Sequence, residues 1–559
     1  MKNNKKWLGL LLCAMLVLSC ALASAETYEV SGSGYGGKLD LTVTIDNGVI
    51  TDIALGENHE TNVVIDRAFP VIRERILEAN SPVVDSVSAA TFSSFAVKAA
   101  VADAMKQAGM DAPSITMATA GEEKPATERA AETCDIVIVG GGPAGLAAAI
   151  GAKQTKPDAN VIVVEKLDIL SGNGKFDMNF FDIINTEAQK KAGNEEWTVN
   201  QVAHFIETKA KSGETAERIE VWANQENILD AWLREMGVEL NYNYGGTNHM
   251  AEANQYSGEV IQAGLERTAY ALNADVRTGT KGVDLVMEDG ACKGVIVTNN
   301  ANETYTIYAS SVIVATGGFC NSKELLAEYA PGYEVMNTSN QMGTTGDFVK
   351  VFEKNGFMME NMGKMSVFAN IIVPRRDLTG GADMNLFVNK EGALLPNASG
   401  KARGELVMAQ PDGAAYYITD KTGYDSFYRI RKHVGLGYYT EGATLAELAG
   451  KLGINAEGLA ASVAQHNADA AAGVENAMIA AVPKRALDAE GPYYGVRVEG
   501  ANHMTKGGVV CNEKAQVLMA DDTVVEGLYA AGECTWQSGA YSQSVCFGKV
   551  AGEQAAAAL

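Results

Sequence analysis

Positive charge, cysteine and histidine are all scarce in this sequence of 559 residues. Lysine and arginine number 45 against 69 aspartates and glutamates, which gives a formal net charge of −24. Nucleic-acid binding requires a basic surface that neutralises phosphates, so this charge argues against nucleic acid as a partner and is typical of an acidic, soluble surface. The eight cysteines form no C-x-x-C pair and no C-x-x-C-H segment. We therefore expect no zinc, haem or other metal, and the scattered spacing predicts no particular disulfide pattern.

Long apolar runs are absent beyond the N-terminus. Three lysines precede an apolar run over residues 7–18, which is shorter than the about 20 residues of a membrane-spanning helix and has the length of a signal-peptide core. We predict a signal peptide over residues 1–25, with cleavage after the Ala-Ser-Ala segment that ends it. The alternative is lipid attachment at Cys20, because Val-Leu-Ser-Cys resembles a bacterial lipobox. Both alternatives place the mature protein in the periplasm or on the outer face of the cell membrane.

Residues 27–110 have the pattern of a small α+β domain. Apolar residues alternate over 39–45, and an Asp-Asn-Gly turn separates them from the next apolar stretch. Amphipathic patterns predict two helices, over residues 66–77 and 94–107. Pro70 falls in the first turn of the first helix, where proline is tolerated.

A second pattern, over residues 135–145, joins an apolar strand to a glycine-rich turn and a helix. Gly140 permits the tight turn, Gly142 lets the backbone approach the pyrophosphate of a dinucleotide, and Gly145 lets helix and strand pack closely. The helix N-terminus presents unpaired N–H groups and the positive end of its dipole to the phosphates. The next strand ends at Glu165, at the spacing expected of an acid that binds the adenosine ribose.

Two distant segments indicate FAD rather than NAD. Residues 311–318 are typical of the returning strand and glycine turn of FAD proteins, and residues 527–533 of the matching C-terminal strand and acid. A nicotinamide enzyme with chance glycines would leave both segments unexplained. We predict a non-covalent FAD held by Gly140, Gly142, Pro143, Ala144, Gly145, Glu165, Lys166, Ser171, Gly172, Asn173, Thr316, Gly317, Gly318, Gly532 and Glu533.

The small domain contains the segment Asp-Ser-Val-Ser-Ala-Ala-Thr, which ends at Thr91. It resembles the flavinylation motif of FMN-binding domains, and segments 34–37 and 59–61 also match that family. The resemblance implies FMN bound covalently at Thr91 through a phosphoester that a flavin transferase makes. The family usually has glycine where Ala89 stands. The alternative is an ordinary Ser/Ala/Thr turn that caps the next helix.

Taken together, these segments resemble the flavoprotein subunits of fumarate reductase and succinate dehydrogenase, in particular extracytoplasmic urocanate and acrylate reductases with an FMN-binding domain. The resemblance implies that a membrane electron donor reduces FMN, that FMN reduces FAD, and that FAD delivers hydride to an alkene under a capping domain. The predicted fold is α/β: a Rossmann-like FAD-binding domain with an inserted α+β capping domain, preceded by the small α+β FMN-binding domain. The expected segments are FMN-binding domain 27–110, mobile linker 111–132, FAD-binding parts 133–339 and 491–559, and capping domain 340–490.

The substrate pocket departs from the fumarate reductase pattern. Phe368 and Met504 stand where the family has histidines, and Ser542 stands where it has a carboxylate-binding arginine. A dicarboxylate buried without cationic partners would bear a large desolvation cost. We therefore expect a conjugated alkene that is less charged than fumarate, an enoate or an enone.

Two residues are candidates for proton delivery. Arg403 precedes an Ala-Gln pair much as the family's proton-donating arginine does, although about three residues closer; the alternative is a solvated surface arginine. Tyr541 is a proton donor, a ligand of a substrate carbonyl or simply a pocket aromatic. His503, also assigned to the pocket, is expected to support the flavin or the loop backbone. The sequence leaves two other functions open: a dehydrogenase that works in the oxidative direction, and an electron-transfer module for a redox partner.

Overall fold

The computed structural model describes residues 25–121, 125–170, 172–175, 180–195, 203, 214–253, 256–373, 376–380, 386–398, 400–536 and 541–559. The predicted signal peptide up to residue 24, with the alternative lipid site Cys20, and the predicted FAD ligand Ser171 lie outside the described residues. The chain divides into two compact units between residues 123 and 124, within the predicted linker. In the described ranges no helix combines the length and the apolar composition needed to cross a membrane.

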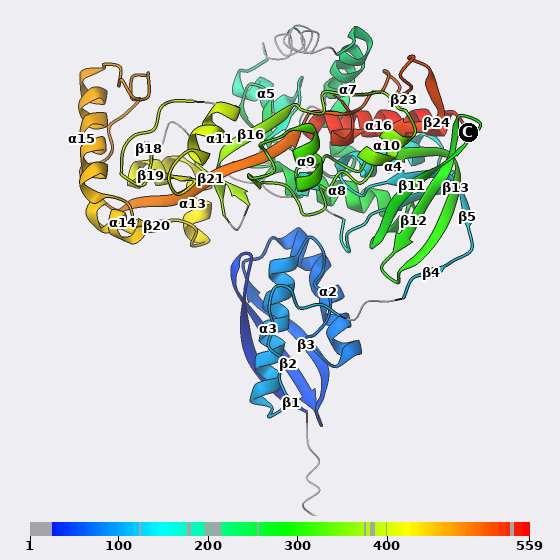
Figure 1. Cartoon of the computed structure of the whole chain (residues 1–559), viewed down its shortest axis with the longest axis horizontal. Helices are drawn as coiled ribbons and strands as arrows, with labels where there is room; N and C mark the ends of the chain where they lie inside the picture. Colours follow the sequence, from blue (N-terminus) through cyan, green and yellow to red (C-terminus); the bar gives the residue numbers. More distant parts are fainter. Residues whose placement is uncertain are drawn as a thin grey trace, which may run out of the picture. The chain divides into compact units, whose positions relative to one another are not determined.

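The smaller unit is a three-stranded antiparallel sheet with two helices (Figure 1). Its elements are β1 (Glu26–Gly34), β2 (Gly37–Asp46), β3 (Val49–Asn58), α2 (Asn62–Ala79) and α3 (Thr91–Gln107). The alternating apolar residues of β2 are buried, as predicted. The Asp-Asn-Gly segment closes the β2–β3 hairpin because Asn47 and Gly48 adopt left-handed backbone, with φ of 49° and 79°.

Helix α2 begins four residues before the predicted helix, so Pro70 lies inside it. The expectation that Pro70 occupies the first turn is therefore wrong. Pro70 and Asp66 are both exposed, so the Asp66 carbonyl, which has no N–H partner at Pro70, can be hydrated. Burial of Ile65, Ile72 and Ile76 on the opposite face stabilises the helix in spite of the lost bond.

Parts of the predicted mobile linker are ordered. In the smaller unit, Lys98 Nζ donates to the Thr119 carbonyl at 2.7 Å, and the Gly121 N–H donates to the Asp85 carboxylate at 2.9 Å. In the larger unit, β4 (Thr127–Glu128) pairs with β13 (Glu303–Val314). Both ends of the predicted linker thus contact the unit that they adjoin, and the mobility of the linker stays a prediction.

The larger unit contains a nine-stranded mixed sheet in the order β10-β6-β5-β13-β12-β11, with β24 and β4 also paired to β13 and with β23 paired to β24. The chain direction is parallel from β10 through β6, β5 and β13 to β24, as expected for a Rossmann-like domain. The new strands are β5 (Glu132–Val139), β6 (Val161–Val164), β10 (Asp275–Arg277), β11 (Thr280–Glu288), β12 (Ala291–Asn299), β23 (Gln516–Leu518) and β24 (Val524–Ala530).

Helices α4 (Pro143–Thr155) and α16 (Tyr541–Ala557) pack side by side against one face of this sheet (Figure 1). A Cβ built at Gly552 would lie 1.9 Å from the Ala148 carbonyl oxygen, so the close approach requires glycine. The remaining elements of this part are β7 (Phe181–Asp182), α5 (Glu187–Ala192), α7 (Ala216–Glu235), β8 (Tyr242–Gly245), β9 (Asn248–Met250), α8 (Ser257–Ala271), α9 (Lys323–Tyr329), α10 (Val349–Lys354), β15 (Met359–Glu360) and β22 (Gly508–Val509), with 3-10 turns η1 (Asn173–Lys175) and η3 (Gly532–Cys534).

The inserted region forms a seven-stranded sheet around the long strand β21 (Tyr493–Thr505), which pairs with β14, β16, β19 and β20. The predicted boundary at residue 490 falls just before β21, which nevertheless belongs to this sheet. Figure 1 shows β21 running from the region of α14 toward α16. The other elements are β14 (Asn337–Thr338), β16 (Met365–Ile372), β17 (Asp377–Leu378), β18 (Leu386–Val388), α11 (Gly400–Met408), β19 (Ala414–Asp420), α12 (Lys421–Ser426), α13 (Tyr428–Gly435), β20 (Thr440–Gly442), α14 (Leu445–Leu452) and α15 (Ala456–Ala472).

Candidate functional site

Four parallel strands of the large sheet end side by side. Register pairs join Val139 of β5 to Val164 of β6 and to Val314 of β13, and Val314 to Ala530 of β24. Each of the predicted FAD segments follows one of these strand ends. The fold therefore gathers at one edge of the sheet residues that are almost 400 positions apart in the sequence, as open α/β sheets do at their ligand sites.

Gly140 and Gly145 have the conformational roles that the sequence predicts. Gly140 has a φ of 116°, and a Cβ there would lie 2.3 Å from the Ala315 carbonyl oxygen. A Cβ at Gly145 would lie 1.8 Å from the Gly140 carbonyl oxygen, which is incompatible with any side chain. Gly142 precedes α4, which begins with Pro143, and its Cβ position is open except for Gly172 at 3.6 Å. This opening and the helix N-terminus suit a phosphate.

Glu165 and Lys166 are held at the end of β6. The Glu165 carboxylate accepts the N–H groups of Gly141 and Leu167, both at 2.8 Å. Lys166 Nζ donates to the Asp347 carboxylate and to Thr345 Oγ1, each at 2.6 Å. Burial would raise the pKa of Asp347, but the ammonium groups of Lys166 and Lys281 outweigh it and hold this pKa below its ordinary value. Both predicted ligands are thus fixed in orientation by backbone and ion-pair partners.

The loop after β6 lies directly against the glycine turn. A Cβ at Gly172 would lie 2.9 Å from Gly142 Cα. Asn173 bonds the segment that follows β14: its Nδ2 donates to Asn340 Oδ1 at 2.5 Å, and its Oδ1 accepts the Gln341 N–H at 2.9 Å. The side-chain amide of Gln341 is buried and has no hydrogen-bond partner among the described residues. A buried amide of this kind requires a polar partner, which a bound group can supply.

Gly318, Thr505 and Glu533 meet at the same edge. A Cβ at Gly318 would lie 2.1 Å from Thr505 Oγ1 and 2.3 Å from Glu533 Oε1. Full burial raises the pKa of Glu533 to about 7, although hydrogen bonds from Thr505 and Asn173 oppose the rise. Gly317 and Gly532 both have left-handed backbone, with φ of 74° and 80°. Together, the open Gly142 cradle, the helix N-terminus and the unpartnered Gln341 amide fit a bound dinucleotide such as FAD.

The smaller unit brings its three matching segments together at one carboxylate. Glu60 is buried; its Oε1 accepts the Gly36 N–H at 2.7 Å, and its Oε2 accepts the Ser93 hydroxyl. A Cβ at Gly34 would lie 2.4 Å from the same carboxylate. Thr91 is the first residue of α3, where a phosphate would meet the positive end of the helix dipole. Two of the matching segments and the first turn of α3, which begins at Thr91, therefore meet at Glu60.

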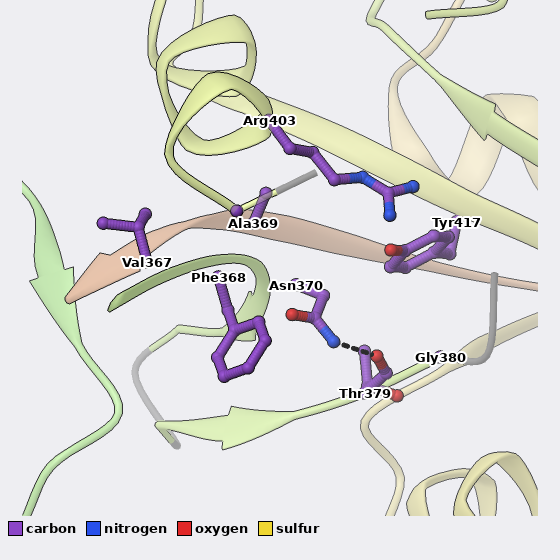
Figure 2. A pocket seen from close by; sticks show the side chains of 9 residues that line it. Val367, Phe368, Ala369, Asn370, Thr379, Gly380, Arg403 and Tyr417 are labelled. Atoms are coloured by element: carbon purple, nitrogen blue, oxygen red, sulfur yellow. Dashed lines mark hydrogen bonds between the residues drawn. The ribbon is translucent and has the colours of Figure 1, made fainter. Parts of the chain in front are cut away.

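A cavity of about 290 Å³ lies in the inserted region (Figure 2). Most of its wall comes from β16 and the turn after β17, and Arg403 of α11 reaches it from another side. Its lining residues are Val367, Phe368, Ala369, Asn370, Thr379, Gly380, Gly400, Arg403 and Tyr417. The sequence placed Phe368 and Arg403 in one site, and both line this cavity.

Arg403 makes no hydrogen bond or ion pair with any described residue, and its Nε is buried. Its guanidinium lies 4.6 Å from the centre of the Phe387 ring. Figure 2 shows it next to Tyr417. Burial raises the pKa of Tyr417, and the nearby guanidinium groups of Arg403 and Arg429 act in the opposite direction. Arg403 is therefore a partly buried cation that lies on the Phe387 ring and lines the cavity.

His503 and Met504 lie on β21 beside this cavity. The His503 ring meets the Phe368 ring edge-on, with centroids 4.5 Å apart, and its Nδ1 lies 2.8 Å from Ser339 Oγ. Met504 pairs with Ser366 of β16. His503 thus contacts a pocket aromatic and the loop at residue 339, in keeping with a supporting position.

Tyr541 and Ser542 are not brought to the cavity. Both begin α16 and are buried against other helices, because that helix packs on α4 and α7. The Ser542 hydroxyl donates to Glu226 Oε1 at 2.9 Å, so its assignment to the substrate pocket is corrected. The Tyr541 ring packs edge-on against Phe181, and its hydroxyl has no partner among the described residues. Burial also raises the pKa of the Tyr541 hydroxyl above its ordinary value. The structure therefore does not support Tyr541 as a second candidate, beside Arg403, for proton delivery at the cavity.

Several site residues were not found from the sequence. Gln341 and Asn340 lie in a loop without a motif, and Thr379 and Tyr417 become neighbours only through β17 and β19. Thr505 could have been found from the sequence, because it follows His503 and Met504 in the segment that resembles the family.

The chain matches two family models. The FAD binding domain matches residues 135–544, and the FMN-binding domain matches residues 34–106. The fumarate reductase (cytochrome) of Shewanella frigidimarina is 30% identical over 76% of this chain and 77% of its own. The urocanate reductase of Eggerthella lenta is 28% identical over 97% of this chain and 94% of its own. The chain spans only 57% of the length of the NADH:fumarate oxidoreductase of Klebsiella pneumoniae, to which it is 29% identical.

A solved structure supports the same relationship. The open conformation of a flavocytochrome c3 fumarate reductase superimposes with a TM-score of 0.68 and 27% identity, covering 76% of this chain and 78% of that chain. The FAD model covers most of the chain, and the FMN model covers most of the smaller unit. The protein therefore belongs to the FAD-dependent oxidoreductase family that includes fumarate and urocanate reductases, and it carries that family's FAD-binding domain behind an FMN-binding domain.

Proposed function

We propose that this protein is an extracytoplasmic reductase that passes electrons from a membrane donor through FMN at Thr91 and through FAD to a conjugated alkene. The relatives whose names describe reduction of fumarate and urocanate support an alkene as acceptor. The joined FMN- and FAD-binding domains support a two-flavin path. The basic and apolar leader supports export, and a flavin transferase would attach the FMN.

The observation that carries the choice of substrate is the charge of the cavity. Among its described lining residues Arg403 is the one cation, and the walls beside it are Val367, Phe368 and Ala369. Fumarate carries two carboxylates, and burying the second without a cationic partner is costly. An enoate or enone with an apolar body places at most one charge there. We therefore propose an alkene less charged than fumarate as the substrate.

In this proposal, separate residues bind the cofactor, bind the alkene and deliver the proton. FAD, when bound, supplies the hydride. Arg403 is positioned to bind the acceptor and to deliver the proton that completes the saturated product. The apolar wall at Val367 and Phe368 would pack against the apolar part of the alkene. Lys166, Glu165 and the glycine turn bind and orient the cofactor.

Reoxidation of the reduced protein tests this function. The protein, made with its flavin transferase and loaded with FAD, is reduced with viologen without oxygen and mixed with cinnamate, an enone or fumarate while flavin absorbance is followed. We expect rapid reoxidation by cinnamate or the enone and negligible reoxidation by fumarate, because a charge-assisted hydrogen bond contributes about 1.5–3 kcal/mol and several are missing. Brisk reoxidation by fumarate, or none by any conjugated alkene, would contradict the proposal.

A further inference from the structure

Among the described residues, a buried lysine of the smaller unit is bonded to neutral groups alone, and the proposed function leaves it unused. Lys98 of α3 is fully buried. Its Nζ lies 3.1 Å from the Val84 carbonyl, 2.9 Å from Ser86 Oγ and 2.7 Å from the Thr119 carbonyl, so an ammonium satisfies all three acceptors with its three N–H groups. Burial lowers the pKa of Lys98, and the charge of Asp85 partly offsets this shift.

Two of these three partners belong to the loop that precedes the predicted attachment residue, Thr91. We call residues 84–90 the flavinylation loop. Lys98 donates to its first carbonyl, and Arg75 of α2 donates to its second and third carbonyls, at 3.2 Å and 3.3 Å. The N–H of its fourth residue donates to Ser94 Oγ of α3 at 3.0 Å. Two cations and one hydroxyl thus hold the loop along the first turns of α3.

The third partner of Lys98 lies in the segment 116–121, which follows α3 and lies beyond the residues that the FMN-binding family model matches. The segment turns back on itself, because its first N–H donates to Thr119 Oγ1 at 2.9 Å. The N–H of Gly121, its last residue, donates to the Asp85 carboxylate of the flavinylation loop at 2.9 Å. Lys98 therefore joins the flavinylation loop to this segment from inside the unit.

Lys98 lies on the same side of α3 as Thr91. The two residues are seven positions apart, which is about two helical turns. Long side chains of a helix lean back toward its N-terminus, which brings the ammonium closer to Thr91 than its own backbone is. The bond to Ser86 Oγ, in the loop that precedes Thr91, agrees with this direction. Thr91 itself is partly exposed, so a transferase can reach its hydroxyl.

Attachment of FMN changes the charge near this lysine. A bond forms between Thr91 Oγ and the flavin phosphorus, the pyrophosphate bond of the FAD donor breaks, AMP leaves and the hydroxyl proton is released. A neutral hydroxyl is thereby replaced by a phosphodiester with one negative charge. A buried positive charge nearby stabilises that product, because the dielectric is low inside the unit.

We propose that Lys98 is a positioning residue for FMN at Thr91: it holds the flavinylation loop against segment 116–121, and its charge offsets that of the FMN phosphate. The inference rests on the proposed function in one respect, since it takes Thr91 as the attachment residue. The segment 116–121 then belongs to the flavin site as well, although it lies outside the residues that the family model matches.

A charge cycle in the full-length protein tests the electrostatic part without flavin or transferase. Thr91→Glu places a carboxylate where the phosphate attaches, and Thr91→Gln places a neutral amide of similar size there. Hydrogen exchange of the α3 amides measures the stability of the helix in each. We expect exchange to be slower in Thr91→Glu than in Thr91→Gln, and the ratio to fall about threefold when Lys98→Met is added. Lys106→Met, at an exposed residue of the same helix, should leave the ratio unchanged.

The rate of attachment tests the positioning part. Full-length protein is incubated with FAD and its flavin transferase, and intact mass follows the FMN adduct with time. Lys98→Met should be flavinylated at least about tenfold more slowly than the wild type, because a misplaced loop slows a reaction that depends on orientation. Lys106→Met should react as the wild type. Lys98→Gln keeps N–H donors without the charge; it should also lose the charge effect, and it keeps the test valid if Lys98→Met does not fold.

A ratio between Thr91→Glu and Thr91→Gln that is the same with and without Lys98 would overturn the inference. If the wild type gains FMN but Lys98→Met and Lys98→Gln gain it as fast, the inference fails and the proposed attachment stands. If the wild type gains no FMN from an active transferase, the proposed attachment at Thr91 fails, and the inference fails with it.

Discussion

Thr505 donates twice to a single oxygen of Glu533: its backbone N–H and its hydroxyl lie 2.9 Å and 3.1 Å from Oε1. Thr505 is the last residue of β21, the central strand of the inserted sheet, and Glu533 follows β24 of the FAD-binding sheet. The two sheets are therefore joined by a buried acid whose proton affinity is high. The pair lies at the strand edge where the predicted FAD segments gather.

Glu533→Gln should remove a pH dependence of stability. Burial raises the pKa of Glu533 from 4.5 to about 7, so the folded state holds this proton more tightly than the unfolded chain, and stability falls as pH rises between those values. Because one pKa unit corresponds to 1.36 kcal/mol, the flavin-free Gln variant should be more stable than wild type above this range, by up to roughly 3 kcal/mol. Below the unfolded pKa the difference should vanish. Urea unfolding across pH measures it, with exposed Glu526→Gln as control; equal pH profiles for wild type and Glu533→Gln would contradict it.

Ala89→Gly should stabilise the smaller unit. Ala89 has a φ of 72°, a left-handed conformation that costs a non-glycine residue about 1–2 kcal/mol. Glycine relieves this cost but adds freedom to the unfolded chain, so the expected net gain is about 0.5–1 kcal/mol. Hydrogen exchange of α3 amides in the full-length protein measures it. Ala108→Gly, at a residue with a φ of −75°, should slightly destabilise the unit instead; faster exchange in Ala89→Gly would show that the backbone is not strained.

Thr91→Ala should abolish covalent flavin. Intact mass of the protein made with its transferase should show one FMN on the wild type and none on the variant, while FAD remains extractable from both. Thr91→Ser keeps a hydroxyl and should keep some adduct. Turnover with the physiological donor should fall in Thr91→Ala, whereas turnover with reduced viologen should persist, because a small dye can reduce FAD directly. Equal loss with both donors would mean that Thr91 serves the fold instead.

Tyr541→Phe should leave the chemistry intact. The Tyr541 hydroxyl is buried without a partner among the described residues, and an unsatisfied buried donor costs about 1–3 kcal/mol. Its removal should leave thermal stability of the flavin-free protein unchanged or raised. Reoxidation of the reduced protein by an alkene should proceed at the wild-type rate. A large loss of reoxidation would contradict this prediction and would indicate that Tyr541 is a proton donor.

Arg403→Gln should reduce alkene-dependent reoxidation by at least about a hundredfold, the lower range of effects on losing a general acid. Reduction of the flavins by viologen should be unaffected, because Arg403 lines the cavity of the inserted region and is not one of the predicted FAD ligands. Lys390→Gln makes the same charge change on the surface and should have no effect. Normal reoxidation in Arg403→Gln would place the proton donor elsewhere in the inserted region.

Local patterns were enough to predict the parts of the fold that depend on neighbours in sequence. The Asp-Asn-Gly hairpin, the alternating β2 core and the glycine turn before α4 were all predicted, because their backbone angles and burial periods are set by adjacent residues. The resemblance of spaced motifs predicted the two flavin domains that the family models match. The start of α2 was wrong because packing of one helix face overrides the local cost of Pro70.

The sequence by itself predicted the flavin-binding segments, whose glycines set the local backbone conformation, and it has Phe368 and Met504 where the family that it resembles has histidines. Only the tertiary structure decided that Ser542 and Tyr541 face the core, because that depends on how α16 packs against α4 and α7. It also decided that Arg403, Tyr417 and Thr379 meet in one cavity. These residues come from a helix, a central strand and a turn with no shared motif, and long-range strand pairing leaves no local pattern in sequence.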